Sequence, residues 1–365
     1  MKLLHLSDLH LGKSLNNYSL IEDQKYCLDQ ILKIIEEENI DTVMIAGDIY
    51  DSSIPSADAL EIYSDFVKEI IFKMNKTILA VSGNHDSAKR LDYNKAFYEA
   101  NNYYMDGEYT GRVVTLEDAF GKIHFHLIPF ISLAKARTLF DTPIKNFTDL
   151  YKNLLAEKTY EDRNVLISHC YANNHAYEDE AYNEDEKPLS MGGSDAMDVS
   201  LFYDFDYVAL GHLHRRHKVS KDYIRYSGTF MKYSFSEVGQ KKSVTIVDLT
   251  DHVEIYEREI LPLHDLEILN DSFENIMKAD PSDAYIQFIL KDDCHIDNVM
   301  GKLKEKFPNA ANVSYEFANK ILDENDIDID INKMDSYDLF QSFYKYKMDE
   351  EMKEDEKEIL KKVIE

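Results

Sequence analysis

The sequence predicts an α/β protein built on parallel β-strands, with a small α+β unit behind it and helices near the C-terminal end. Short apolar runs at 2–7, 42–46 and 77–81 are typical of buried strands, and the amphipathic stretches 20–38 and 56–73 between them are typical of helices. This βαβαβ order predicts parallel strands connected by right-handed crossovers.

The rest of the chain contains further strands and a change of pattern after about residue 260. Additional strands are expected at 122–128, 164–168, 206–210, 214–219 and 243–248. A strand at 284–290, a helix at 298–307 and a strand at 312–317 would form the α+β unit. The predicted parts are a large domain over 1–260, a cap domain over 261–320, an acidic linker over 321–334 and a helical segment over 335–365.

The charge of the chain is strongly acidic but unevenly distributed. The 365 residues carry a net charge of -28, which taken alone argues against nucleic-acid binding. Acidic residues are concentrated in 175–206 and beyond 321, while basic residues cluster near the motifs described below. These clusters are Lys89-Arg90, Arg215-Arg216-His217-Lys218 and Lys241-Lys242. A locally basic rim could hold DNA, although ordinary solvated charge is the alternative for each cluster.

Cysteine usage and hydropathy predict a cytoplasmic protein without a membrane segment. Cys27, Cys170 and Cys294 are widely spaced and odd in number, which is typical of buried reduced thiols. No run approaches the roughly 18 apolar residues of a membrane span. The N-terminus enters a strand directly, without an apolar signal core.

Five separated motifs share one character, since each offers carboxylate, imidazole or amide groups after an apolar strand. They are Asp8-Leu9-His10, Gly47-Asp48-Ile49-Tyr50-Asp51, Gly83-Asn84-His85-Asp86, Ser168-His169 and Gly211-His212-Leu213-His214. Side chains two residues apart on an extended segment point the same way, so Asp8 can act together with His10. Ligands bind at the carboxyl ends of strands in open α/β sheets, so the five motifs can converge on one rim.

The ligand chemistry of these motifs indicates a two-metal site. Oxygen and nitrogen ligands without a thiolate suit Mn²⁺ or a similar divalent ion better than structural zinc. Two ions about 3.5–4 Å apart form a clamp for in-line displacement at phosphorus. The pair needs a bridging carboxylate, for which Asp48 is the natural choice, and it lowers the pKa of a shared water. Each motif alone is more often structural, so the prediction rests on all five together.

In this order the motifs resemble those of the calcineurin-like metallophosphoesterase superfamily. The resemblance implies a β-sandwich flanked by helices in αββα layers. It implies that one metal is held by Asp8, His10, Asp48 and His214, and the other by Asp48, Asn84, His169 and His212. It makes His85 the catalytic histidine that is not a ligand, and it puts Asp51 where a carboxylate orients that histidine.

Longer strings narrow the resemblance to the SbcD-like branch of DNA-repair nucleases. They are 45–51, 82–87, 191–195, 206–215 and 226–229. The resemblance implies Mn²⁺-dependent 3′–5′ exonuclease activity on duplex DNA, endonuclease activity on single strands, and ATP-dependent control by an SbcC-like SMC-type ATPase. Cys170-Tyr171 and the acidic insertion 175–187 depart from the pattern of the branch.

Two association surfaces are also expected. The branch forms dimers through the region of helices 20–38 and 56–73, where Tyr63, Phe66 and Ile70 would supply an apolar seam. Facing the sheet is an equally open alternative for these residues. The apolar stripe within 335–365 has little domain left to pack against, so it is expected to bind the ATPase.

Two other functions remain open from the sequence. A stand-alone phosphatase or cyclic-nucleotide phosphodiesterase would suit the acidic charge, whereas the cap and the C-terminal helices oppose it. A scaffold protein with an inactive site is opposed by the complete set of ligand residues.

Overall fold

The computed structural model describes residues 1–156, 161–173, 196–250 and 252–316, together with positions 341, 344, 352, 357 and 360. The chain divides into two compact units. One comprises Met1–Leu290 and Ile296–Val313, and the other Lys291–His295 and Ser314–Glu365. The acidic insertion 175–187, the string 191–195, the linker 321–334 and nearly all of 335–365 lie outside the described residues.

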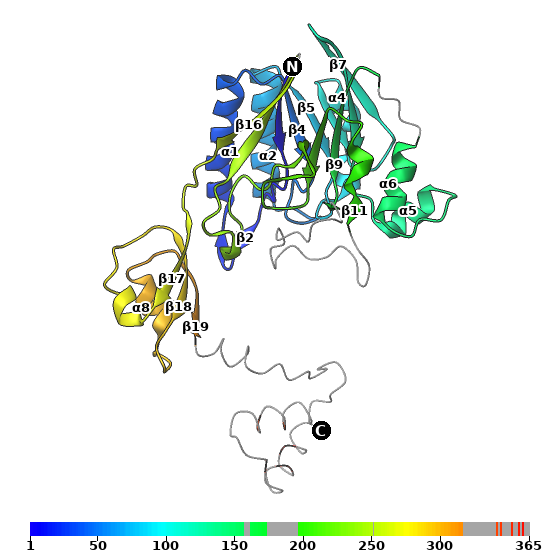
Figure 1. The fold of residues 1–365 in the computed structure, drawn as a ribbon. Helices are drawn as coiled ribbons and strands as arrows, with labels where there is room; N and C mark the ends of the chain where they lie inside the picture. Colours follow the sequence, from blue (N-terminus) through cyan, green and yellow to red (C-terminus); the bar gives the residue numbers. More distant parts are fainter. Residues whose placement is uncertain are drawn as a thin grey trace. The chain divides into compact units, whose positions relative to one another are not determined.

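The first unit contains a six-stranded sheet whose centre has the predicted parallel order (Figure 1). Its strand order is β16 (Val253–Glu259), β15 (Ser243–Leu249), β1 (Lys2–Leu6), β4 (Thr42–Ala46), β5 (Thr77–Val81) and β6 (Tyr103–Asp106). Strands β1, β4, β5 and β6 run parallel, and β15 pairs antiparallel with β1. The parallel arrangement predicted for 2–7, 42–46 and 77–81 is confirmed.

A second six-stranded sheet carries the other motifs. Its order is β13 (His217–Val219), β14 (Lys221–Tyr226), β12 (Tyr207–Gly211), β9 (Arg163–His169), β8 (Gly121–Ile128) and β7 (Val113–Asp118). Strands β8, β9, β12 and β14 are parallel, while β7 and β13 join as antiparallel edges. Strands β7 and β14 were not predicted, because their exposed residues weaken the apolar signal.

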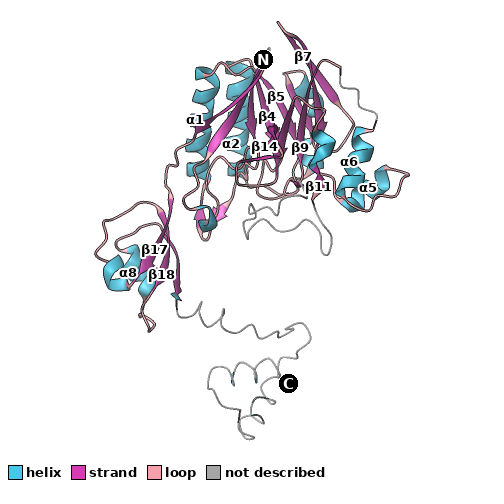
Figure 2. Cartoon of the chain, viewed as in Figure 1, coloured by secondary structure: helices cyan, strands magenta, loops and turns pink. Residues whose placement is uncertain are grey.

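The two sheets pack face to face through a shared core that includes Phe125 and Tyr207, and helices cover their outer faces (Figure 2). Helices α1 (Ile21–Glu37) and α2 (Ala57–Lys68) pack on the first sheet, and α6 (Phe147–Leu155) packs on the second. The predicted αββα layers are therefore confirmed. The remaining elements of this part are β2 (Ser14–Leu15), β3 (Tyr18–Ser19), η1 (Glu69–Lys73), α3 (Ala88–Leu91), α4 (Lys95–Glu99), α5 (Leu133–Leu139), β10 (Ala172–Asn173), β11 (Met197–Asp198), η2 (Val199–Phe202) and η3 (Phe235–Glu237).

A small α+β segment follows β16 in sequence. It contains β17 (Leu266–Asp271), α7 (Phe273–Ile276), β18 (Tyr285–Leu290), α8 (Val299–Lys304) and β19 (Ala310–Tyr315), with strand order β17-β18-β19. Phe288 and Phe307 form its buried centre, with ring centroids 5.5 Å apart. In the second unit, the rings of His295 and Tyr315 meet edge to face at 4.7 Å.

The prediction that an apolar seam on α2 and η1 mediates self-association is wrong. Tyr63, Phe66 and Ile70 are 6%, 2% and 0% exposed and belong to the core beneath the first sheet. The apolar stripe of an amphipathic helix on a sheet is used to cover that sheet, so it is not available to a second molecule.

Cys27, Cys170 and Cys294 are free thiols, but Cys294 is exposed rather than buried. Among the described residues, no helix combines the length and the apolar character needed to cross a bilayer.

Candidate metal centre

The polar motifs meet where the strands of both sheets end. Asp8 and His10 follow β1, Asp48 follows β4, and Asn84 with His85 follows β5. From the second sheet, His169 ends β9, and His212 and His214 follow β12. His169 Nδ1 lies 2.9 Å from the carbonyl oxygen of Ala46 at the end of β4, so the two sheets contribute to one centre. The structure brings together all seven residues predicted as metal ligands.

The loops that carry these side chains have a strained backbone. Asp8, His10, Asp48 and His212 have φ angles of 52°, 43°, 49° and 111°, in the left-handed region that residues with a Cβ rarely adopt. Each such residue costs on the order of 1–3 kcal/mol and persists only where its surroundings fix it. Backbone N–H groups of Asp8 and His10 donate to the carbonyl oxygens of Gly47 and Asp48, each at 3.0 Å, and tie the loops together.

Glycines beside the motifs allow the loops to approach closely. A Cβ on Gly83 would lie 2.1 Å from Oδ1 of Asp48, and one on Gly211 would lie 1.9 Å from the carbonyl oxygen of Ala46. No other residue type fits at these two positions without displacing the strand ends. The glycines of the motifs are therefore required by the spacing of the centre.

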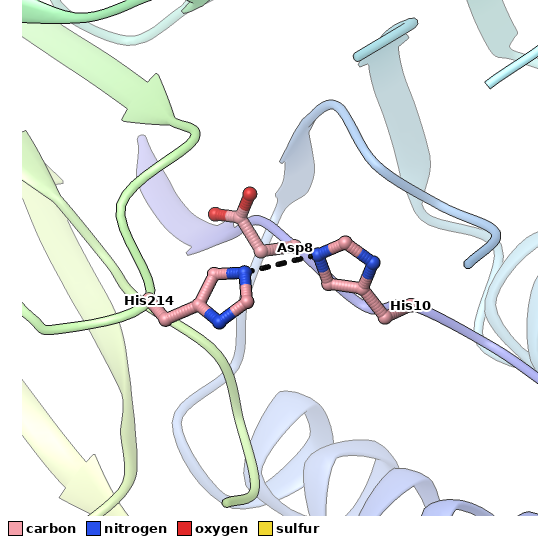
Figure 3. A group of neighbouring side chains, drawn as sticks. All are labelled: Asp8, His10 and His214. Carbon is pink, nitrogen blue, oxygen red and sulfur yellow. Dashed lines mark hydrogen bonds between the residues drawn. The ribbon is translucent and has the colours of Figure 1, made fainter. Parts of the chain in front are cut away.

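The first cluster consists of Asp8, His10 and His214 (Figure 3). The Nε2 atoms of His10 and His214 are 3.1 Å apart. On the other side of each ring, Nδ1 of His10 lies 3.3 Å from Oδ1 of Asp51, and Nδ1 of His214 lies 3.4 Å from Oε1 of Glu237. Carboxylate oxygens only accept, so they favour a proton on each Nδ1. Two Nε2 lone pairs would then face each other, an arrangement that a bound cation stabilises.

The second cluster consists of Asp48, Asn84, His169 and His212. The Nδ1–H of His169 donates to the Ala46 carbonyl, which turns Nε2 toward Oδ1 of Asn84 at 2.9 Å and Oδ2 of Asp48 at 3.4 Å. Nδ1 of His212 lies 3.3 Å from the same Asn84 oxygen. One imidazole nitrogen thus faces two oxygen acceptors, a position suited to a proton or a metal ion.

The electrostatics of the centre reflect buried carboxylates among imidazoles. Burial raises the pKa of Asp8, which is 0% exposed. Burial alone would raise the pKa of Asp48 too, but the charge of His169 and its hydrogen bond outweigh burial and hold this pKa well below its ordinary value. For His169, burial is outweighed by Asp48, so its pKa is raised to about 9. Burial and the neighbouring His169 lower the pKa of His212 to about 3.

These observations fit divalent metal ions. Buried charges in proteins are paired or coordinate metals, and here two buried aspartates lie among imidazole and amide groups. The donors are oxygen and nitrogen, with no thiolate among them, which suits Mn²⁺ and similar ions. The division into one set with Asp8, His10 and His214 and another with Asn84, His169 and His212, sharing Asp48, stays a prediction.

His85 lies at the edge of the centre and is exposed. Its backbone N–H donates to Oδ1 of Asp48 at 2.8 Å, and its ring centroid is 4.9 Å from that of His10. Its Nδ1 lies 3.1 Å from the carbonyl oxygen of Asp51, whereas the Asp51 carboxylate is 2.9 Å from Nζ of Lys13 and 3.3 Å from His10. The contact expected between the Asp51 carboxylate and His85 is therefore made by the Asp51 backbone.

Sequence reasoning missed two groups that hold the centre. The Asp86 carboxylate accepts backbone N–H bonds from Ile49, Tyr50 and Gly83 and so joins two motif loops, a role that its place in the Gly-Asn-His-Asp motif could have indicated. Glu237 lies outside every motif, and only the folded chain brings it to His214.

Comparisons with known proteins agree with this geometry. Residues 1–216 match the family described as Calcineurin-like phosphoesterase, and residues 262–348 match the one described as Type 5 capsule protein repressor C-terminal domain. The SbcD subunit of nuclease SbcCD from Staphylococcus epidermidis is 31% identical over 377 residues, which cover 100% of this chain and 98% of that protein. The chain belongs to the calcineurin-like phosphoesterase family. Its full-length similarity to the staphylococcal protein places it in the SbcD branch.

Membership of this family makes the chain a phosphodiester hydrolase whose centre serves divalent metal ions. Two solved structures resemble it at lower identity. A dimetal phosphatase from Danio rerio is 13% identical, with a TM-score of 0.44 over 72% of this chain and 98% of that chain. A Thermus thermophilus protein is 12% identical, with a TM-score of 0.40 over 70% of this chain and 98% of that chain.

Replacing Asp48 by Asn should remove most of the stabilisation that Mn²⁺ gives. An ion present at 100 times its Kd stabilises a folded protein by about 2.7 kcal/mol per site, and Asp48 is predicted to serve both sites. Calorimetric melting with EDTA and then with Mn²⁺ should show a rise in Tm for the wild type and little rise for Asp48→Asn. Asp222→Asn, a change at an exposed aspartate of β14, should keep the full rise. Equal rises in all three proteins would contradict the assignment.

Proposed function

We propose that this phosphoesterase is a Mn²⁺-dependent DNA nuclease, the nuclease subunit of an SbcCD-type repair complex. Its activities would be 3′–5′ exonuclease on duplex DNA and endonuclease on single strands, with ATP-dependent control from an SbcC-like partner in the cytoplasm. The observation that carries the proposal is the convergence of all seven predicted ligands at the strand ends, with His85 exposed beside them. The staphylococcal relative is named as a nuclease, which supports the choice of DNA as substrate.

The residues of the centre have distinct parts in this reaction. Divalent ions held by the two clusters would neutralise charge on the phosphate and lower the pKa of a nearby water. His85 is exposed, and its Nδ1–H donates to the Asp51 carbonyl, so Nε2 is the nitrogen that can contact the phosphate or protonate the leaving oxygen. Asp51 also positions His10 through its carboxylate.

A basic rim near the centre supports binding of a nucleic acid. Lys218 pairs with Asp222 and Lys241 with Glu259, whereas Lys89, Arg90 and Arg215 are exposed and form no ion pair with a described carboxylate. Such cations are available to phosphates. Lys242, expected in the same rim, is instead 7% exposed and paired with Glu237.

A direct test compares substrates. With Mn²⁺, the protein should digest end-labelled duplex DNA and nick single-stranded circles, while a generic phosphomonoester is a poor substrate. Preference for the phosphomonoester or for a cyclic nucleotide would favour the stand-alone phosphatase or phosphodiesterase instead.

Replacing His85 by Ala should separate chemistry from metal binding. General acid–base groups contribute typically about 10²–10⁴-fold, so the variant should cut DNA at least ~100-fold more slowly while binding Mn²⁺ with wild-type affinity. Isothermal titration and single-turnover digestion measure the two quantities. His252→Ala, at an exposed histidine outside the centre, should match the wild type in both. Loss of Mn²⁺ binding in His85→Ala would show that His85 is a ligand.

We also propose a homodimer through the side of the first unit that carries α1 and α2. With the predicted seam buried, the support is an exposed apolar patch that comprises Leu60 of α2 together with Tyr93 and Tyr98. These three side chains line one pocket of about 430 Å³. Exposed apolar groups gathered at one place are typical of an interaction surface.

Tyr93→Glu should therefore convert a dimer to a monomer, because a charge in an apolar interface is costly to desolvate. Light scattering at micromolar concentration should give twice the chain mass for the wild type and the single-chain mass for the variant. Phe120→Glu, at an exposed phenylalanine next to β7, serves as the control and should stay dimeric. A monomeric wild type would exclude the dimer.

The segment 335–365 is proposed to bind the ATPase. Its apolar stripe includes Leu339, Phe340 and Phe343 in a part of the chain that is otherwise acidic, and short amphipathic helices commonly serve as docking elements. The acidity of the segment suggests a basic surface on the partner.

Deleting 335–365 should leave Mn²⁺ binding and single-strand cleavage intact and abolish co-purification with an SbcC-like ATPase. ATP-stimulated cutting should be lost with it. Pull-down with the tagged ATPase and a nuclease assay measure both effects. Unchanged affinity of the truncated chain for the ATPase, or unfolding of its catalytic part, would overturn this proposal.

A further inference from the structure

The Glu237 carboxylate is buried beside the metal centre. Glu237 closes the short helical turn η3 and is 1% exposed. Its Oε1 lies 3.4 Å from Nδ1 of His214, and its Oε2 lies 2.6 Å from Nζ of Lys242. A buried carboxylate with one oxygen toward a predicted metal ligand and the other toward a buried ammonium requires a physical explanation.

Lys242 holds the same histidine from a second side. Its side chain is 7% exposed, and Nζ donates to the carbonyl oxygen of His214 at 3.1 Å and to Oγ1 of Thr229 at 2.8 Å. The backbone N–H of Thr229 also donates to that carbonyl, at 3.1 Å. The ring and the backbone of His214 are thus contacted by the two members of one ion pair.

Burial of this ion pair is not explained by stability alone. Removing two charges from water costs free energy that their attraction often fails to recover, and an apolar pair of the same size would frequently be as stable. Metal-ligating histidines, by contrast, almost always donate their other ring nitrogen to a carboxylate or carbonyl, which fixes the tautomer and the ring orientation. His169 has such an acceptor in the Ala46 carbonyl at 2.9 Å, and the group in the corresponding place for His214 is the Glu237 carboxylate, 3.4 Å from Nδ1.

We propose that Glu237, held in place by Lys242, is a positioning residue for His214. It keeps the proton on Nδ1 and leaves the Nε2 lone pair directed at the metal centre, where Nε2 of His10 lies 3.1 Å away. The inference rests on the ligand role proposed for His214 and extends it to a pair of residues that no motif contains. Asp51 is the corresponding carboxylate beside His10. It holds its histidine less firmly, since its side chain is 31% exposed and also contacts Lys13.

Two measurements on full-length Glu237→Gln test the inference. Titration with Mn²⁺, followed by calorimetry and electron paramagnetic resonance, should show affinity at one of the two sites about 10–100-fold weaker and the other unchanged. Long-range ¹H–¹⁵N spectra of the metal-free protein should show His214 protonated at Nδ1 in the wild type and a shift away from that tautomer in the variant. Unchanged Mn²⁺ affinity with an unchanged tautomer would overturn the proposal, even if the variant melts at a lower temperature.

Glu237→Gln leaves the Lys242 charge buried without its partner, so this variant could fail to fold. The double variant Glu237→Gln/Lys242→Met removes both charges and avoids that cost. It should fold and still bind Mn²⁺ weakly at one site, and wild-type affinity in the double variant would overturn the proposal.

Asp118→Asn is a matched control for the loss of a carboxylate that holds two cations. Asp118 is bound by Arg163 and by the N-terminal ammonium at 2.7 Å, and it is not among the residues of the centre. This variant should lose stability while keeping its Mn²⁺ affinity and the His214 tautomer. If the wild type binds no Mn²⁺, the metal role itself fails, and the tautomer in Glu237→Gln still decides whether Glu237 controls His214.

Discussion

The carboxylates of Asp8 and Asp48 lie almost completely buried at the ends of the adjacent parallel strands β1 and β4, and much of the structure serves this placement. Two neighbouring carboxylates repel each other, and both lose their hydration on burial. Favourable contacts with the surrounding groups must compensate for these two free-energy costs. Imidazoles from the opposite sheet provide part of it, as the raised pKa of His169 shows. Left-handed loop residues hold the carboxylates in position at a local cost that the packed strands beneath them offset.

Much of this arrangement could be predicted from the sequence, for reasons that particular elements show. The strands at 42–46 and 77–81 are continuous apolar runs because both of their faces are buried, and the structure reproduces their bounds. The motif residues could be grouped because parallel strands bring their carboxyl ends to one edge. Asp8, Asn84 and His214 therefore converge although long stretches of chain separate them.

Other features depend on tertiary contacts that no local pattern carries. Tyr63 and Phe66 have the spacing of an interaction seam, but the same spacing is typical of a helix that covers a sheet. In this structure both side chains pack in the core under the first sheet. Asp51 contacts His85 through its backbone because its carboxylate turns to His10 and Lys13. The sequence marks Lys242 only as part of a basic cluster and does not mark Glu237 at all, since their contacts with His214 exist only once η3 and β15 reach the loop after β12.

The division of the centre between the two sheets has a mechanical consequence. The first sheet contributes Asp8, His10, Asp48 and Asn84, and the second contributes the three remaining histidines. An ion bound by groups from both sheets acts as a cross-link between layers that otherwise adhere mainly through apolar contacts, and such contacts have little directional preference. Slippage of one sheet over the other by a fraction of a side-chain width would disrupt coordination before it exposed the core. An ion held by both sheets would therefore couple metal occupancy to the shear stiffness of the sandwich.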